Sequence, residues 1–151
     1  MIVFLPCSTI AECVDFIAQP HLMRVALNCQ IVSTVINETN SLAAELQDHP
    51  SVTMWRGHET FLVAYGLACI DRYLERAPED QHGHDVHAAL QREMDLAMTE
   101  GYDPSPPSFM GNALMHGRFK RYLATEAPHL YYGHLDEIGH WDYTLFAEHH
   151  G

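Results

Sequence analysis

The spacing of apolar residues along the chain predicts helices from its first third onward. The tetrapeptide TIAE at residues 9–12 matches the T-x-x-E capping box, which predicts a helix that begins at Ile10. Pro20 should interrupt this helix, because proline lacks the backbone N–H that a helix interior uses. A second helix is expected from His21 to about Val35, before the polar stretch NETN.

The strongest helical periodicity follows a short piece at residues 41–47. Between Val52 and Ala77, apolar residues recur at intervals of three and four, which predicts one long amphipathic helix. The next stretch, PEDQHGHD, favours a loop. It precedes another amphipathic helix at residues 85–100. The residues expected to face inward on that helix are Val86, Leu90, Met94 and Met98.

The last third of the chain contains one more predicted helix, from about Asn112 to Ala127, before Pro128. The proline-rich DPSPPS before it indicates an ordered connector. The tail that begins HLYYGHL is aromatic and interrupted by glycines, so we expect an irregular segment that packs across the helices. The pattern as a whole predicts an all-α fold: a single compact domain, residues 1–151, of about five helices with an irregular aromatic C-terminal segment.

Composition supports a globular protein of the cytoplasm. Hydrophobic residues make up 47% and charged residues 19% of the 151 residues. No apolar run approaches the ~20 residues of a membrane helix, and the opening MIVFLPC lacks the basic region of a signal peptide. The four cysteines form no C-x-x-C pair, which favours free thiols in a reducing compartment.

Charge limits the ligands that the surface can attract. The net charge of −12 argues against broad nonspecific attraction to nucleic acid, so a site for a polyanion must be a local patch. Arg118, Lys120 and Arg121 place three of the eight basic residues within four positions, which makes them the best candidate for phosphate contacts. Arg24 would extend this patch, whereas a solvated helix end is the alternative interpretation.

Three blocks of sequence together resemble the pyrimidine-dimer DNA glycosylase family and its bacterial and phage relatives. HPSVTMWRGHETFLVAYG at 49–66 is similar to the family's central motif, H-P-x-V-x-M-W-R-G-x-E followed by Y-G. PPSFMGNALMHGRFKRYL at 106–123 and APHLYYG at 127–133 resemble its later segments. The opening MIVFLP and the segment HLMR also fit the family's order. These blocks cover about two-thirds of the chain, and the central motif is the most specific.

The resemblance implies an enzyme that acts on damaged DNA without a cofactor. Family members use the α-amine at the chain start as a nucleophile on C1′ of the damaged nucleotide. The base is released, an imine forms with the sugar, and strand cleavage can follow. The pKa of an α-amine lies near 8, so a usable neutral fraction exists at pH 7. A glutamate of the second helix stabilises the cationic transition state, while arginines hold the flanking phosphates.

The chain departs from the family at its catalytic positions. The amine would belong to Met1, because Ile2 is too bulky for ready removal of the initiator methionine and replaces the usual arginine. The catalytic glutamate aligns with Asn28, or with Leu27 if the register slips by one residue. Asparagine can donate and accept hydrogen bonds, but it cannot take up a proton. The family's S-H-R has become the sequence RFK at 118–120.

Other residues of these blocks have a structural and a functional interpretation. Trp55 is expected to anchor the core, while Arg56 and Glu59 could pair on a helix surface. Glu59 is also the nearest carboxylate of the motif that could replace the missing acid, with His58 beside it. Arg56 is also a candidate DNA contact. The remaining candidates are His21, His116, Tyr131 and Tyr132, each of which could instead pack as an ordinary buried or half-buried side chain.

The histidines His82, His84 and His87 form an H-x-H-x-x-H pattern that suggests a metal site. They lie outside the family blocks, and no cysteine or glutamate nearby completes a set of ligands. We therefore expect a solvated histidine-rich loop, with neither a metal nor a cofactor.

Three functions follow from the sequence. The first is a DNA glycosylase and AP lyase that uses the Met1 amine. The second is a relative that kept the fold and lost or changed the reaction, recognising damaged or modified DNA or modifying a base or nucleotide by other chemistry. The third is an acidic interaction module that binds a basic protein. DNA is the expected ligand, no membrane is involved, and the absence of the family's glutamate favours the second function over the first.

Overall fold

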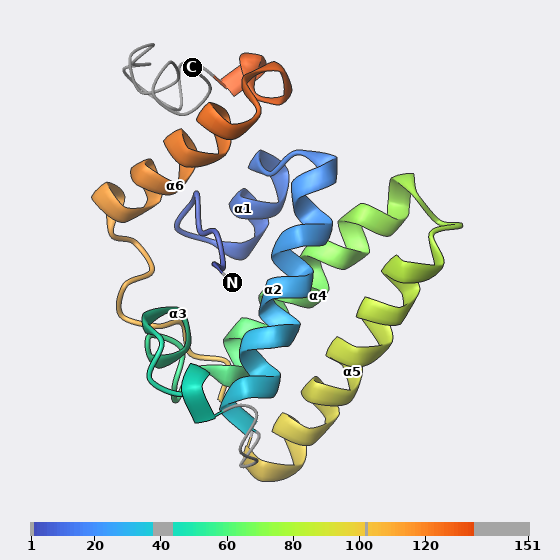
Figure 1. Ribbon diagram of the computed structural model, residues 1–151, viewed down its shortest axis with the longest axis vertical. Coiled ribbons are helices and arrows are strands. Elements are labelled where there is room, and N and C mark those ends of the chain that lie inside the picture. Colours follow the sequence, from blue (N-terminus) through green and yellow to red (C-terminus); the bar gives the residue numbers. More distant parts are fainter. Residues whose placement is uncertain (1, 38–43, 102, 135–151) are drawn as a thin grey trace. The chain divides into compact units, whose positions relative to one another are not determined.

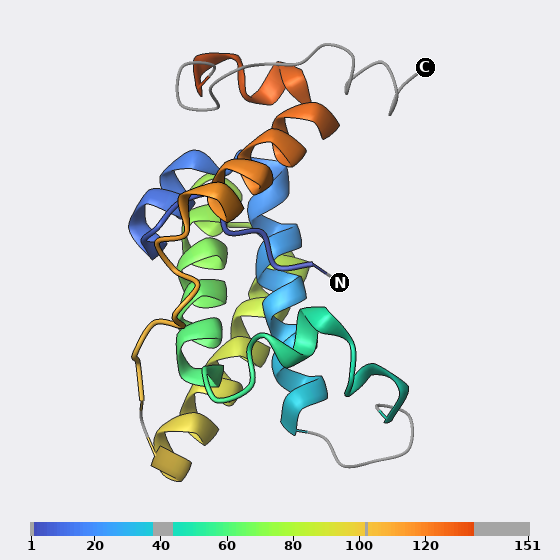
Figure 2. The ribbon, with the colours of Figure 1, turned by 90° about the vertical axis from the view of Figure 1, so that its left-hand side faces the viewer.

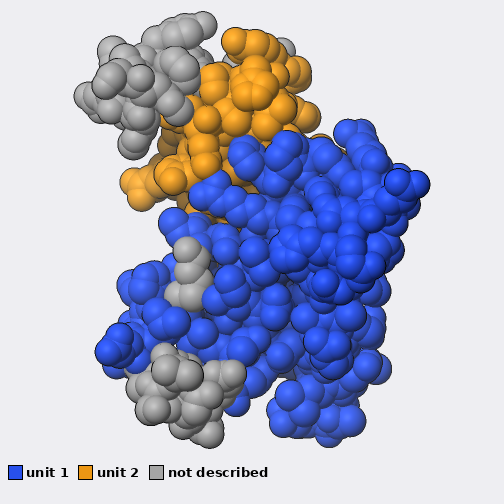
Figure 3. Space-filling model, turned by 45° about the vertical axis from the view of Figure 1, so that its right-hand side comes forward, with its two compact units in different colours: residues 1–3, 19–108 blue, residues 4–18, 109–151 orange. Residues whose placement is uncertain are grey.

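The computed structural model describes residues 2–37, 44–101 and 103–134, and these residues confirm the all-α fold. They contain six α-helices and three short 3-10 helices, with no strand in the described ranges. The chain divides into two compact units (Figure 3): residues 1–3 with 19–108, called unit 1, and residues 4–18 with 109–151, called unit 2. None of the described helices is both long and apolar enough to cross a lipid bilayer.

Three long helices build unit 1. They are α2 (Gln19–Asn37), α4 (Glu59–Arg76) and α5 (Gln81–Gly101), and each contacts the other two. Both ribbon views show them side by side (Figures 1 and 2). Their shared core holds the buried residues Val25, Cys29 and Val32 of α2, Leu62, Tyr65, Cys69 and Ile70 of α4, and Val86 and Leu90 of α5.

The boundaries of α2 show how local chemistry determines the helix start. Pro20 lies in the first turn of α2 rather than in a helix interior, so its missing N–H removes no helical hydrogen bond. The predicted second helix is therefore confirmed, but it is longer than expected and ends at Asn37. Of the predicted piece at 41–47, the described part is the 3-10 helix η1 (Ala44–Leu46).

The single helix predicted from Val52 to Ala77 is wrong in its first part. A short helix, α3 (Pro50–Thr53), is separated from α4 by a turn that contains Trp55 and Gly57. Gly57 has φ +84, a left-handed conformation that an L-residue adopts only at a cost, and it breaks the helix there. Trp55 is fully buried and stacks near Phe61 at 6.4 Å between ring centroids, so it anchors the core from this turn instead of from a helix face.

The predicted loop PEDQHGHD is confirmed only for residues 78–80 and is wrong for 81–85, because α5 already begins at Gln81. Asp80 explains the earlier start: its carboxylate accepts a hydrogen bond from the Gly83 N–H at 3.3 Å and another from the Tyr73 hydroxyl. This is the usual way in which a side-chain oxygen satisfies the first N–H groups of a helix. The inward positions predicted on α5 are correct for Val86 and Leu90, whereas Met98 is 58% exposed.

Unit 2 is built from α1 (Ile10–Phe16), α6 (Ala113–Glu126) and the 3-10 helices η2 (Pro128–Leu130) and η3 (Tyr132–His134). The capping box of α1 is confirmed, since the Thr9 hydroxyl accepts from the Glu12 N–H at 3.2 Å. Asn112 caps α6 in the same way through the Met115 N–H. Within unit 2, Phe4 in the segment before α1 contacts Phe119 and Tyr122 of α6 (Figures 1 and 2 show these elements). The predicted C-terminal tail lies outside the described residues beyond His134.

Candidate nucleic-acid interface

Asn28 lies on α2, and its side chain contacts the start of the chain. The amide Nδ2 donates a hydrogen bond to the backbone carbonyl of Ile2 at 2.7 Å. Asn28 is one of the two residues, with its neighbour Leu27, that align with the catalytic glutamate of the family that the sequence resembles. The structure therefore brings this position to within one residue of Met1, which itself lies outside the described residues.

The chemistry of this position differs from that of an acid. An amide that donates to a carbonyl fixes the backbone of the N-terminal segment, but it carries no charge and exchanges no proton. Ile2 is 42% exposed, so the segment that Asn28 holds borders solvent. The arrangement can position the chain start, and it cannot perform general acid–base catalysis through Asn28.

The helix α2 that carries Asn28 approaches α4 closely at the next residue, Cys29. A Cβ atom built on Gly66 of α4 would be 2.8 Å from the Cβ of Cys29 on α2, nearer than two such atoms come. Gly66 belongs to the Y-G pair of the central motif, and this close approach explains why a glycine occupies that position. Burial raises the pKa of the Cys29 thiol, and it raises that of Cys69 on α4 as well. Both thiols are therefore uncharged packing groups at neutral pH.

Three polar residues of the central motif, Arg56, His58 and Glu59, have contacts with residues other than Asn28. The Arg56 guanidinium donates to the backbone carbonyl of Gln47 at 2.9 Å and also to its side-chain oxygen. Glu59 accepts from the Gly57 N–H at 3.1 Å, so the expected partners Arg56 and Glu59 each have other contacts. His58 lies near Asp103, whose pKa is lowered first by hydrogen bonds from Ser105 and also by the His58 charge.

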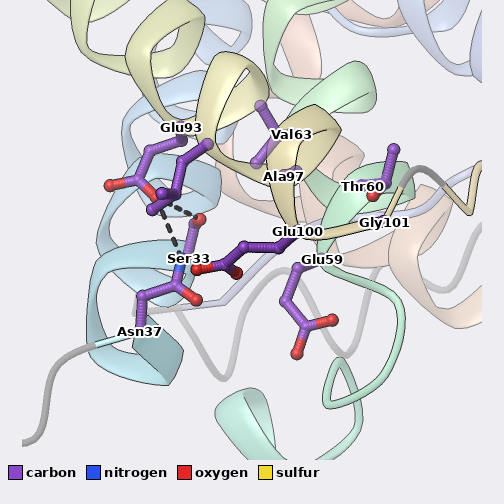
Figure 4. A pocket seen from close by; sticks show the side chains of 10 residues that line it. Ser33, Asn37, Glu59, Thr60, Val63, Glu93, Ala97, Glu100 and Gly101 are labelled. Atoms are coloured by element: carbon purple, nitrogen blue, oxygen red, sulfur yellow. Dashed lines mark hydrogen bonds between the residues drawn. The ribbon is translucent and has the colours of Figure 1, made fainter.

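Glu59 faces a pocket of about 260 Å³ in unit 1 (Figure 4). Glu93 and Glu100 of α5 line the same pocket, together with Ser33 and Asn37 from the end of α2. Ser33 and Asn37 donate to the Glu93 carboxylate at 3.1 and 3.0 Å. Three carboxylates around one pocket repel phosphate, and Asn28 does not line it. Glu59 therefore lines an acidic pocket to which Asn28 does not contribute, and its role as a substitute for the family's acid stays a prediction.

The basic cluster of the sequence lies along α6 in unit 2. Arg118 is exposed, whereas Lys120 and Arg121 are half-buried. The Lys120 ammonium lies 5.4 Å from the centre of the Phe16 ring, a cation–π distance, so part of its role is packing. With Glu126 as the only acidic residue of the helix, α6 carries a net charge of +2. Both units are acidic as a whole: the sequence places five basic and thirteen acidic residues in unit 1, and three basic and seven acidic residues in unit 2. The basic character is thus local to α6.

His116 and His21 are both buried, as the structural interpretation of these residues expects. The Nε2 atom of His116 accepts from the Gly111 N–H at 2.9 Å, so Nδ1 carries the proton and donates to the Leu5 carbonyl at 2.6 Å. Both nitrogens of His116 are engaged, and a contact from this ring to DNA would break one of these bonds. Arg24 is exposed on α2, in unit 1.

The two adjacent tyrosines have different environments. Tyr131 is fully buried and stacks on Phe16 with ring centroids 5.2 Å apart. Its hydroxyl accepts from the Ala18 N–H at 3.2 Å, and burial raises its pKa to about 12. Tyr132 is 66% exposed. Of this pair, only Tyr132 has a ring that a base can reach.

The three histidines of the H-x-H-x-x-H pattern lie in the first turns of α5, and two of them, His84 and His87, have separate side-chain partners. His84 contacts the Pro78 carbonyl at 2.7 Å, and His87 lies 3.2 Å from the Asp71 carboxylate. Within the described ranges, no group of three or more histidine, cysteine or acidic side chains is arranged to hold a metal ion.

Two features of the surface had only a weak signal in the sequence. Glu93 and Glu100 are ordinary charged positions on an amphipathic helix, and their meeting with Glu59 depends on how α4 packs against α5. Tyr122 lies one turn after Arg118, and its exposure follows from that spacing once the inner face of α6 is known.

Comparisons with known protein families, with characterised proteins and with solved structures find no match to this chain.

Proposed function

We propose that this chain is a DNA-acting protein of the pyrimidine-dimer glycosylase type that recognises damaged or modified bases. The observation that carries the proposal is the hydrogen bond from the Asn28 amide to the Ile2 carbonyl at 2.7 Å. The family resemblance, derived from sequence alone, requires this helix position to lie beside the chain start. A helix and an N-terminal segment that are 26 residues apart in the sequence meet at that position.

The physical roles of the motif residues support the same reading. Trp55 fills the core, Gly57 permits the turn before α4, and Gly66 permits the close approach of α2 to α4. These residues define the central motif, and the packing or backbone conformation at each position explains why that residue type occurs there. The basic residues of α6 supply the phosphate contacts that the proposal needs, because phosphate binding depends on clustered cations.

Recognition without efficient base excision is the form of the function that we propose. The family's acid stabilises a cationic sugar, and the neutral amide of Asn28 supplies neither that charge nor a proton acceptor. Any retained reaction would therefore be a different modification of a base or nucleotide. We place the protein in the cytoplasm, in keeping with four free and buried cysteines.

Binding and trapping measurements test this function together. The intact protein is titrated with duplexes that contain an abasic site, a pyrimidine dimer or neither, and each complex is then treated with borohydride. We expect tighter binding to a damaged duplex and little covalent product, because the imine that borohydride reduces forms slowly without the acid. Equal affinity for damaged and intact duplexes, or no binding to any of them, would contradict the proposal.

The variant Asn28→Glu is the chemical control. It places a carboxylate beside the N-terminal segment, so trapping on the abasic duplex should rise above that of the natural chain. Asn28→Gln lengthens the side chain by the same amount without adding a charge, and it should not raise trapping. A gain with both variants would assign the effect to loosening of the chain start rather than to the acid.

The acidic pocket of unit 1 favours one second candidate, an interaction module for a basic protein. Glu59, Glu93 and Glu100 surround a hollow large enough for a lysine or arginine side chain (Figure 4). Capture of a basic partner that survives nuclease treatment and is lost in Glu93→Gln with Glu100→Gln would support this function. Loss of the partner on nuclease treatment would show that DNA mediates the interaction.

A further inference from the structure

Tyr122 on α6 has one ring face covered and much of its surface in solvent. Its ring stacks on Phe4 with centroids 5.3 Å apart and planes 26° from parallel. Phe4 is 1% exposed, and Phe119 meets it edge-on at 5.9 Å and 87°. Tyr122 itself is 46% exposed. The aromatic core of unit 2 thus holds the Tyr122 ring in a fixed orientation at the surface.

Cationic groups lie beside this ring on the same helix. Arg118 is exposed one turn before Tyr122, at the i,i+4 spacing that places two side chains on one face. Arg121 folds back along the helix, since a Cβ on Gly117 would lie 3.6 Å from its Nη1 atom. Gly117 leaves room for that guanidinium, which brings it toward the turn that carries Arg118. Leu114, 63% exposed, continues the exposed face one turn earlier.

We propose that Tyr122 is a stacking platform for an unpaired base, with Arg118 and Arg121 holding the phosphates beside it. The proposal deepens the function proposed above and rests on it. Aromatic rings interleaved with cations are the means by which proteins hold single strands, because every base has a face that stacks. A tyrosine with one face already packed loses little conformational freedom when a base covers its exposed surface.

The arrangement discriminates against intact duplex. In a continuous helix both faces of each base are covered by its neighbours, so Tyr122 finds a base face only at a strand end, a gap, or a lesion that unstacks the helix. The arginines bind phosphates in either form. Unit 2 should therefore bind single-stranded DNA, or duplex with an unstacked base, more tightly than intact duplex at the same salt concentration.

Single-stranded and duplex oligonucleotides of equal length test the inference, with 2-aminopurine as the fluorescent base. The natural chain should bind the single strand more tightly and quench the probe. Tyr122→Leu keeps an apolar cover over Phe4 without an aromatic ring, and its affinity for the single strand should fall roughly 5- to 100-fold. Tyr122→Phe should bind as the natural chain does, and Leu114→Ala, on the same face, should leave binding unchanged.

The outcomes separate this inference from the function on which it rests. Salt-dependent DNA binding that is insensitive to Tyr122→Leu, or that falls equally for single strand and duplex, overturns the stacking platform and leaves the proposed function intact. If the protein binds no DNA in a salt-dependent way, both the stacking platform and the proposed function are wrong. A loss of DNA affinity in Leu114→Ala equal to that in Tyr122→Leu overturns the platform too, because it shows that the loss is not specific to an aromatic ring.

Discussion

Gly66 gives the sharpest prediction about the scaffold that holds Asn28. Substitution by alanine would place a Cβ 2.8 Å from the Cβ of Cys29 and 3.1–3.2 Å from the two terminal methyl groups of Leu90. The Cys29 Cβ is bonded directly to the backbone of α2, so relief requires that the helix itself moves. Overpacking of this kind costs about 1–3 kcal/mol, while alanine recovers at most ~1 kcal/mol of helix propensity. We expect Gly66→Ala to destabilise the protein by about 1–2 kcal/mol.

Gly83→Ala is the matched control, because it makes the same substitution in a helix of the same unit. The three atoms nearest to its new Cβ would all be ends of side chains: Leu74 Cδ2 at 2.9 Å, Tyr73 Cε1 at 3.2 Å and Met23 Cε at 3.4 Å. These ends can shift without moving a helix, so the variant should lose clearly less stability than Gly66→Ala. Urea unfolding followed by circular dichroism measures the free energy of unfolding of both variants. We expect the same dependence of that free energy on urea concentration for the two. A Gly66→Ala protein as stable as Gly83→Ala would refute the close approach of α2 and α4.

Three further predictions concern individual side chains. Asn28→Asp replaces the amide donor by a carboxyl group that can donate to the Ile2 carbonyl only when it is protonated. The variant should therefore be less stable than the natural chain at pH 7, and this difference should shrink below about pH 4. A pH-independent deficit would contradict that contact. The pKa of Asp80 is lowered, first by the Tyr73 hydroxyl and then by the Gly83 N–H, so its stabilising contribution is complete above about pH 4 and is lost as pH falls through its folded pKa. Asp80→Asn should consequently lose less stability on acidification than the natural chain, as followed by thermal unfolding. His116→Ala leaves the Leu5 carbonyl and the Gly111 N–H without their partner and should cost about 2 kcal/mol, whereas His129→Ala, at an exposed position, should cost little in the same unfolding assay.

The fold class was readable from sequence because its signals are local. The TIAE capping box fixes the start of α1, and the apolar spacing of residues 59–76 follows one helix face. The break at Gly57 was missed, since a glycine inside an apolar pattern is compatible with either a helix or a turn. The early start of α5 depends on how Asp80 meets Tyr73 and Gly83, a contact that the polar appearance of this stretch conceals.

The candidate site could be predicted only in part. The resemblance to a family motif drew attention to Asn28, or Leu27, and to the chain start, and the structure has a hydrogen bond from Asn28 to Ile2. The role of this position stays a prediction. The pocket around Glu59 depends on residues of α5 that are 34 and 41 positions later in the chain, and no periodicity relates them. The role of Tyr122 depends on Phe4, whose packing brings the N-terminal segment of unit 2 against α6. Long-range contacts of this kind require the folded chain.

The salt dependence of DNA binding tests the central claim most directly. Three cations on α6 predict a plot of log affinity against log salt with a slope of about −2 to −3. The double variant Arg118→Ala with Arg121→Ala should reduce the slope to about −1, whereas Arg72→Ala with Arg76→Ala, which removes the same charge from α4, should leave it unchanged. Binding that is absent or independent of salt, or that responds equally to both double variants, would contradict a nucleic-acid site on this helix.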